Sequence, residues 1–266
     1  PFCRGADGRA VLRSSVREFL AQELMDALGI PTSRSLTLYV SRSEIVRRPW
    51  YSKGSKYFEP DIMIDNQAAI TTRVAPSFLR VGQIELFARR VRNNAHNKAL
   101  NELEMIVQHL IDRNYKDEID YEISLESKVI KLASLYRSRL ISLVVNWMRV
   151  GFIHGVMNTD NMTISGETID YGPCAFMDTY DPKTVFSSID KMGRYAYCNQ
   201  PAITKWNLSR FAECLIPLID DDENKAIKSA TELIETFAKK YEEKWLNMMR
   251  SKLGLLGEDK KDKFLI

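Results

Sequence analysis

The sequence predicts an α+β chain in which a small mixed segment precedes a mainly helical block. Helix-like and strand-like patterns alternate in residues 1–95, whereas apolar residues recur at helical spacing through most of residues 96–266. With 45% hydrophobic residues, a chain of 266 residues can bury one substantial core or two small lobes.

The mixed segment opens with a predicted helix. Apolar side chains recur at helical spacing from Ala10 to Leu28, and Gly29-Ile30-Pro31 should end the helix. Asp7 is available to cap its first turn. Glu18 has no basic neighbour one helical turn away, so spacing alone indicates a solvated charge.

Two strands should follow this helix. Residues 35–41 (SLTLYVS) and 68–74 (AAITTRV) resemble strands, whereas the polar stretch 51–65 resembles a loop. Arg73 lies at the end of the second strand, and Arg80 follows a proline that favours a turn or a helix start. The two arginines could therefore converge, and guanidinium groups suit phosphate oxygens. Taken alone, an arginine at a strand end is usually a surface residue.

Four helices are predicted in the helical block. Their apolar residues follow a period of 3.6, and the second helix carries a long apolar stripe that must pack against other helices. The predicted helices cover residues 97–115, 124–150, 205–216 and 223–249.

The strongest candidate site lies between these helices. The motif HGVMNTDN ends at Asp160-Asn161, and the motif IDYG follows with Asp170 as its acid. Residues 162–169 resemble a strand, a tight turn and a second strand, which would place the three side chains at the ends of one hairpin. Mg²⁺ on a nucleotide usually takes one or two protein carboxylates besides phosphate oxygens. Asp and Asn are also common turn residues, but three such groups around one hairpin favour a metal site.

This arrangement resembles the catalytic loop of protein kinases, H-R-D-x-x-x-x-N followed by D-F-G. His154 and Asn161 keep the spacing, and Asp170-Tyr171-Gly172 stands where D-F-G would. Val156 occupies the position of the usual catalytic base and cannot accept a proton. A carboxylate lies beside the asparagine instead, at Asp160. A mixed segment followed by a helical block is also the order of a kinase-like two-lobed fold.

The run HGVMNTDNM…IDYGP resembles the SelO/YdiU (selenoprotein O) family, kinase-fold proteins that transfer AMP rather than phosphate. The resemblance covers most of residues 3 to about 216. Its other motifs are DGRAVLRSSVREFL at 7–20, GIPTSR at 29–34, RVAPSFLR at 73–80, NQP at 199–201 and WNL at 206–208.

The resemblance implies a role for each matching residue. Asp160 would be the base that activates the target hydroxyl. Asn161 and Asp170 would hold Mg²⁺ or Mn²⁺, and Asp170 would also contact the nucleotide. Arg73 and Arg80 match the arginine pair that the family uses at the phosphates.

Three further residues are implied on the nucleotide side. Asp7 and Gly8 would line the nucleotide pocket, and Glu18 would pair with the kinase lysine. In this family ATP binds flipped, so that the α-phosphate is attacked and pyrophosphate leaves. The implied partners are ATP and proteins that present Ser, Thr or Tyr hydroxyls.

One departure concerns the family's lysine and glycine-rich segment, K-G-x-G-x-T-P-Y-S-R, which should precede Asp7. The chain begins Pro1-Phe2-Cys3-Arg4, which resembles the end of that segment. The expectation is a fragment with a truncated, partial N-lobe over residues 1–95 and a helical C-lobe over residues 96–266. Its nucleotide pocket would be open on one side, so the fragment alone can be inactive.

Two other functions remain open from the sequence. A phosphotransferase of the aminoglycoside or choline kinase type has a similar H-G-D-x-x-x-x-N motif, but Val156 replaces its Asp. A non-catalytic pseudokinase scaffold would not need the retained Asp160, Asn161 and Asp170.

Composition argues against several other classes. Thirty-eight basic and 35 acidic residues are mixed throughout, which argues against a nucleic-acid surface. No apolar run approaches the ~20 residues of a membrane span, and no signal peptide is recognised. Cys3, Cys174, Cys198 and Cys214 have neither metal-ligand spacing nor the density of a disulfide framework. We expect an intracellular protein, cytoplasmic if bacterial and mitochondrial if eukaryotic.

Overall fold

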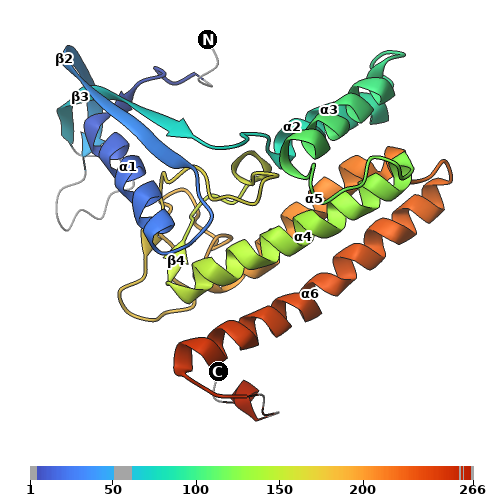
Figure 1. Ribbon diagram of the computed structural model, residues 1–266. Coiled ribbons are helices and arrows are strands. Elements are labelled where there is room, and N and C mark those ends of the chain that lie inside the picture. Colours follow the sequence, from blue (N-terminus) through green and yellow to red (C-terminus); the bar gives the residue numbers. More distant parts are fainter. Residues whose placement is uncertain (1–4, 51–61, 258, 260, 265–266) are drawn as a thin grey trace. The chain divides into compact units, whose positions relative to one another are not determined.

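The computed structural model describes residues 5–50, 62–257, 259 and 261–264 (Figure 1). These residues form a mixed α/β chain with two small sheets and six α-helices. The chain divides into two compact units, the first made of Pro1–Ala75 with Asp170–Gly172 and the second of Pro76–Ile169 with Pro173–Ile266. The amino-terminal stretch of the first unit ends at Ala75, which is earlier in the chain than the domain boundary predicted after residue 95. The assignment of the two units as kinase lobes stays a prediction.

The first unit packs a helix on a three-stranded antiparallel sheet. Strand β1 (Ala10–Val11) leads into helix α1 (Leu12–Ala27), which contacts β2 (Arg34–Trp50) and β3 (Ile62–Val74). The strand order is β1-β3-β2, so β3 is central. Gly29, at φ +71°, ends the helix region as predicted, because glycine adopts the left-handed conformation without strain.

Two local predictions for this unit are wrong. Residues 62–65 were assigned to a loop, but they pair with β2 as a ribbon, in which Arg47 lies opposite Asp65 with Nε and Oδ1 3.6 Å apart. The rest of that predicted loop, residues 51–61, lies outside the described residues. Asp7 does not cap α1, because the N-cap of that helix is Val11. The Asp7 carboxylate instead accepts hydrogen bonds of 2.8 and 2.9 Å from Arg48 on β2.

The second unit is mainly helical, and all four predicted helices are confirmed. Helix α5 begins earlier and α6 ends later than predicted. Helix α2 was not predicted; it is short and its second half is rich in arginine, although its buried face carries Val81, Ile84 and Ala88. The α-helices and strands are α2 (Val81–Arg92), α3 (Ala99–Asn114), α4 (Leu125–Arg149), β4 (Phe152–Ile153), β5 (Ala175–Phe176), α5 (Gln200–Ile219) and α6 (Glu223–Leu253).

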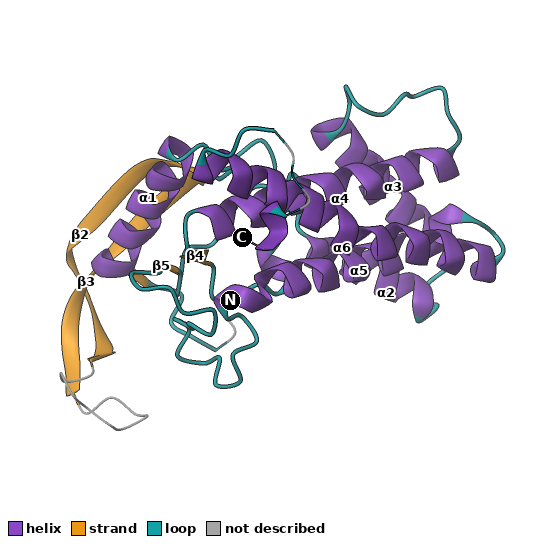
Figure 2. Cartoon of the chain, turned by 90° about the horizontal axis from the view of Figure 1, so that it is seen from below, coloured by secondary structure: helices purple, strands orange, loops and turns teal. Residues whose placement is uncertain are grey.

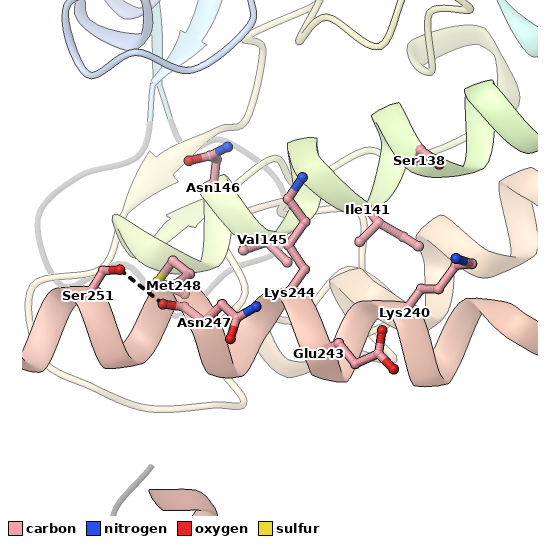
Figure 3. Close-up of a pocket in the computed structure, with 10 residues that line it drawn as sticks. All are labelled: Ser138, Ile141, Val145, Asn146, Lys240, Glu243, Lys244, Asn247, Met248 and Ser251. Carbon is pink, nitrogen blue, oxygen red and sulfur yellow. Dashed lines mark hydrogen bonds between the residues drawn. The ribbon is translucent and has the colours of Figure 1, made fainter. Parts of the chain in front are cut away.

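The core of this unit lies along α4, which packs on both α5 and α6 (Figures 1 and 2). Tyr136 of α4 meets Phe211 of α5 edge to face, with ring centroids 4.8 Å apart. A groove with a volume of about 600 Å³ lies between α4 and α6, and Figure 3 shows ten residues that line it. Beside it, Lys244 of α6 donates a 2.5 Å hydrogen bond to Ser142 of α4. Among the described residues, no helix combines the length and apolar character needed to cross a bilayer.

The predicted hairpin over residues 162–169 is wrong. Thr163 forms an isolated antiparallel bridge with Arg80, not a ladder with the following residues. A turn does form, closed by the Thr163 hydroxyl, which donates to Glu167 O at 2.6 Å and accepts from Glu167 N at 2.9 Å. Met162, Thr163 and Ile164 are all buried, so the segment lacks the exposed face that an alternating hairpin strand requires.

Candidate functional site

Residues 154–161, here called the HG loop, follow β4 and are fixed by a buried histidine. His154 has no exposed surface, and its Nε2 lies 2.9 Å from Ile169 O. Because a carbonyl oxygen can only accept, Nε2 carries the proton. Nδ1 is then free to accept from Val156 N at 3.4 Å. One side chain thus links the start of the HG loop to the residue that precedes Asp170.

Two fully buried amides of α5 hold the HG loop from a second direction. Gln200 accepts from His154 N at 3.0 Å and donates to Phe152 O at 2.9 Å. Asn207 donates to Met157 O at 2.9 Å. From the sequence, both residues belong to the NQP and WNL motifs of the family resemblance, which predicts no role for them. A polar amide among the apolar positions of a helix was the available signal, because buried polar groups need partners.

Helix α2 holds the other end of the HG loop. Thr159 donates to Glu85 at 2.7 Å, and Arg80 Nη1 donates to Asp160 O at 3.1 Å. The Asp160 side chain lies against Gly82, so closely that a Cβ on that glycine would come 2.5 Å from Asp160 Oδ1. Neither Gly82 nor Glu85 was singled out from the sequence, because α2 itself was missed.

Asn161 and Arg80 each keep a polar group available beside Asp160. The Asn161 amide nitrogen donates to Val156 O at 2.9 Å, which leaves the Oδ1 atom as an acceptor. Arg80 Nε is buried and has no hydrogen-bond partner among the described residues. The second unit therefore brings together three predicted site residues, Arg80, Asp160 and Asn161.

The first unit brings together three others. Arg73 Nη2 lies 2.9 Å from Glu18 Oε1 and 3.4 Å from Asp170 Oδ1. The Glu18 side chain is only 15% exposed, and burial raises its pKa, although Arg73 and a hydrogen bond from the Tyr171 main chain oppose this. The interpretation of Glu18 as a solvated charge is wrong, because the partner Arg73 comes from β3 and not from the same helix.

Residues 170–172, here called the DYG segment, belong to this first unit. Asp170 has a left-handed backbone, φ +67°, which Asp and Asn tolerate better than most residues. The buried Tyr171 hydroxyl bonds to the Thr32 hydroxyl, and Arg17 donates to Gly172 O at 2.5 Å. The DYG segment is thus attached to α1 and the chain that follows it.

Glu18 also lines a cavity within the first unit. The cavity has a volume of about 410 Å³, and Ser15, Thr71 and Arg73 contribute to its lining. Glu18 Oε2 and Ser15 Oγ are buried without a hydrogen-bond partner among the described residues. Two buried acceptors beside one cavity favour a ligand or a side chain that donates hydrogen bonds.

Asp7 and Gly8, the two residues predicted at the nucleotide pocket, are not among the residues that line the Glu18 cavity. The hydrogen bonds from Arg48 lower the pKa of Asp7 to about 2, with a smaller effect from Arg9 N. Gly8 lines a cavity of about 430 Å³ together with residues of β2 and β3. A nucleotide-binding role for Asp7 and Gly8 stays a prediction.

The donor chemistry of the proposed metal ligands suits a hard cation. Asn161 offers an amide oxygen, and Asp170 offers a carboxylate that is 40% exposed. Among the described residues, no group of three or more His, Cys, Asp or Glu side chains could hold a metal ion.

The cysteines add nothing to this donor set. Cys174 and Cys214 are buried, Cys198 is exposed, and none of the three is in a disulfide. Cys3 lies outside the described residues.

Comparison with known proteins agrees with the motifs. The family model described as "Protein adenylyltransferase SelO" matches residues 1–266. Proteins named "Protein nucleotidyltransferase YdiU" from Pelagibacter ubique and Anoxybacillus flavithermus are 52% and 49% identical over 266 and 270 residues; each match covers 100% of this chain and 50% of the relative. A third, from Nitrosococcus oceani, is 46% identical over 262 residues, 98% of this chain and 48% of its own. The chain spans about half the length of these curated relatives, and it belongs to the SelO protein adenylyltransferase family.

Proposed function

We propose that the protein is an adenylyltransferase that moves AMP from ATP to Ser, Thr or Tyr hydroxyls of other proteins and releases pyrophosphate. The observation that carries this proposal is the Asp160 carboxylate, beside Asn161 in a loop fixed by α2 and α5. Val156, two residues after His154, leaves the usual kinase base position without a proton acceptor. The family match supports the same reaction.

In this reaction Asp160 accepts the proton of the target hydroxyl as its oxygen attacks the α-phosphate. A general base must lie within about 2.6–3.2 Å of the proton donor, so the fixed main chain of Asp160 is an advantage. Arg73 and Arg80 bind phosphate oxygens. The unpartnered Nε of Arg80 supports this role, since its Nη1 is already engaged by Asp160 O.

We assign the divalent ion, Mg²⁺ or Mn²⁺, to Asn161 and Asp170. When bound, it neutralises phosphate charge and so favours attack by a nucleophile. These two side chains come from different units of the chain, and their convergence on one nucleotide is part of the proposal.

On the nucleotide side, Asp7 and Gly8 contact ATP. The Glu18 carboxylate accepts a hydrogen bond from a donor such as the lysine of the kinase-like fold. The buried, unpartnered Glu18 Oε2 supports such a donor. We propose that the two units are the partial N-lobe and the helical C-lobe of this two-lobed fold. The activity is proposed for a protein of its relatives' length, inside the cell, either cytoplasmic or mitochondrial.

The position of a radiolabel tests the reaction. The full-length natural protein is incubated with Mg²⁺, an acceptor protein and ATP labelled at either the α- or the γ-phosphate. AMP transfer labels protein only from α-labelled ATP, and intact mass spectrometry should show added AMP. Label from γ-labelled ATP would establish the phosphotransferase alternative. ATP binding that does not depend on Mg²⁺, with no transfer of either label, would favour the non-catalytic pseudokinase scaffold.

A further inference from the structure

We propose that Gly82 is a positioning residue for Asp160, because its missing side chain leaves the space that the carboxylate occupies. This inference rests on the proposed function, since it assigns Asp160 the role of base. Gly82 lies in the first turn of α2, and Asp160 lies in the short 3₁₀ helix Thr159–Asn161.

The fit between the two residues is too close for any other amino acid at position 82. A Cβ built on Gly82 would lie 2.5 Å from Asp160 Oδ1, 3.4 Å from its Cγ and 3.3 Å from Thr159 Oγ1. Cβ atoms essentially never approach another heavy atom to within 3.0 Å, because such a distance is well inside van der Waals contact. Any side chain at this position must therefore displace the carboxylate.

Backbone conformation does not explain the glycine. Gly82 lies within a regular helix and is absent from the residues with positive φ. Glycine in a helix interior is less favourable than alanine because it loses more conformational freedom on folding. The backbone at position 82 therefore does not require glycine, and the room left for Asp160 accounts for it.

The carboxylate is also the part that would move. Arg80, the N-cap of α2, holds the main-chain oxygen of Asp160 through Nη1, and the Thr159 hydroxyl is bound to Glu85 of α2. Both of these residues of the short 3₁₀ helix are thus tied to α2 or its cap. An added methyl group would turn the Asp160 side chain about its own bonds and leave the loop in place. Gly82→Ala should consequently preserve the fold and misplace the base.

The experiment measures AMP transfer by the full-length natural protein under single-turnover conditions with α-labelled ATP. Misplacing a reacting group by about 1 Å can cost on the order of 10²-fold in rate, so Gly82→Ala should slow transfer by roughly 10- to 100-fold. KM for ATP should change by less than about twofold, and the unfolding midpoint should not fall. Leu86→Ala, at an exposed position one turn further along α2, is the matched control and should keep the wild-type rate.

A double-mutant comparison separates positioning from a general structural effect. In an Asp160→Ala background, Gly82→Ala should cost nothing further, because no carboxylate remains to be displaced. A wild-type rate for Gly82→Ala, or an equal loss in both backgrounds, overturns the inference while AMP transfer by the wild type still stands. A wild-type protein that transfers no AMP overturns the proposed function and this role of Gly82 together.

Discussion

The HG loop and the DYG segment each carry a carboxylate of the proposed site, but they are held by different kinds of contact. The start of the HG loop, as far as Met157, is bound by the neutral, fully buried side chains of His154, Gln200 and Asn207. Its far end, at Thr159 and Asp160, is bound by Glu85 and Arg80. The DYG segment is held largely by charged groups, with Arg73 shared between Asp170 and Glu18.

This difference predicts that the start of the HG loop and the DYG segment should respond differently to salt and pH. Neutral buried hydrogen bonds keep their strength across changes of salt and pH that leave the fold intact. Ion pairs that are partly exposed weaken with salt and with the protonation of either partner. We therefore expect the start of the HG loop to keep its position, and the position of Asp170 to depend on the charge of its neighbours and ligands.

The largest effect should come from removing the Asp170 carboxylate. Asp170→Ala should abolish metal-dependent nucleotide binding, measured by titrating ATP with and without Mg²⁺. Asp170→Asn is the matched control for the backbone, because asparagine tolerates the left-handed conformation that alanine resists. If both variants retained metal-dependent binding, Asp170 would not be a ligand.

The next effect sharpens the contrast, since Asp160 should act on the rate and not on binding. Asp160→Ala should spare metal-dependent ATP binding and slow AMP transfer by ~10²–10⁴-fold, the usual contribution of a general base. Single-turnover transfer and an ATP titration on the same preparation measure both quantities. Equal transfer by the variant and the wild type would end the assignment of Asp160 as base.

A smaller effect tests the neutral support of the HG loop. Asn207→Leu leaves Met157 O without its buried donor and should lower the free energy of unfolding by about 1–3 kcal/mol. Chemical denaturation at low and high salt should give the same loss, because the missing bond is uncharged. Asn101→Leu, at an exposed position of α3, is the control and should change stability little. A loss that disappears at high salt would contradict the neutral-contact account.

The smallest effect concerns the charged side of the comparison. Burial raises the pKa of Glu18 above its ordinary value of 4.5, so the folded state keeps that proton to a higher pH than the unfolded state does. Its contribution to stability is therefore complete below pH 4.5 and is lost as the pH rises through the raised pKa. Glu18→Gln should remove this decline from the free energy of unfolding measured as a function of pH.

Glu23 on the same helix provides a control of opposite sign. Arg34 lowers the pKa of Glu23 to about 2, so its contribution is present above the ordinary pKa of 4.5 and is lost as the pH falls toward 2. Glu23→Gln should alter only that acid range. If both variants changed the same pH range, the raised pKa of Glu18 would be refuted.

Much of the fold could be read from local pattern. In α3, α4 and α6 the apolar residues recur in each successive helical turn, so a short stretch of sequence is enough to show the period. The missed features depend on distant residues. The far end of the β2–β3 ribbon mixes apolar and polar residues without a regular alternation on either strand, so only the pairing of residues 62–67 with residues 45–50 reveals it.

The site was predictable to a different degree. The motifs identified Asp160, Asn161 and Asp170, because these residues belong to short motifs whose spacing can be recognised directly in the sequence. Contacts such as Glu18 with Arg73, or Gly82 with Asp160, join residues from separate elements, and no spacing rule connects them. Gly82 was harder still, since its contribution is the absence of a side chain.

The first unit is assembled from two stretches that are far apart along the chain, residues 1–75 and residues 170–172. Tyr171, which arrives with the second stretch, has no exposed surface and bonds to Thr32. During synthesis, the amino-terminal sheet and helix must therefore wait until residue 172 has left the ribosome before their interior is complete. Expressing residues 1–75 alone would give a polypeptide that lacks Tyr171 in the interior of this unit.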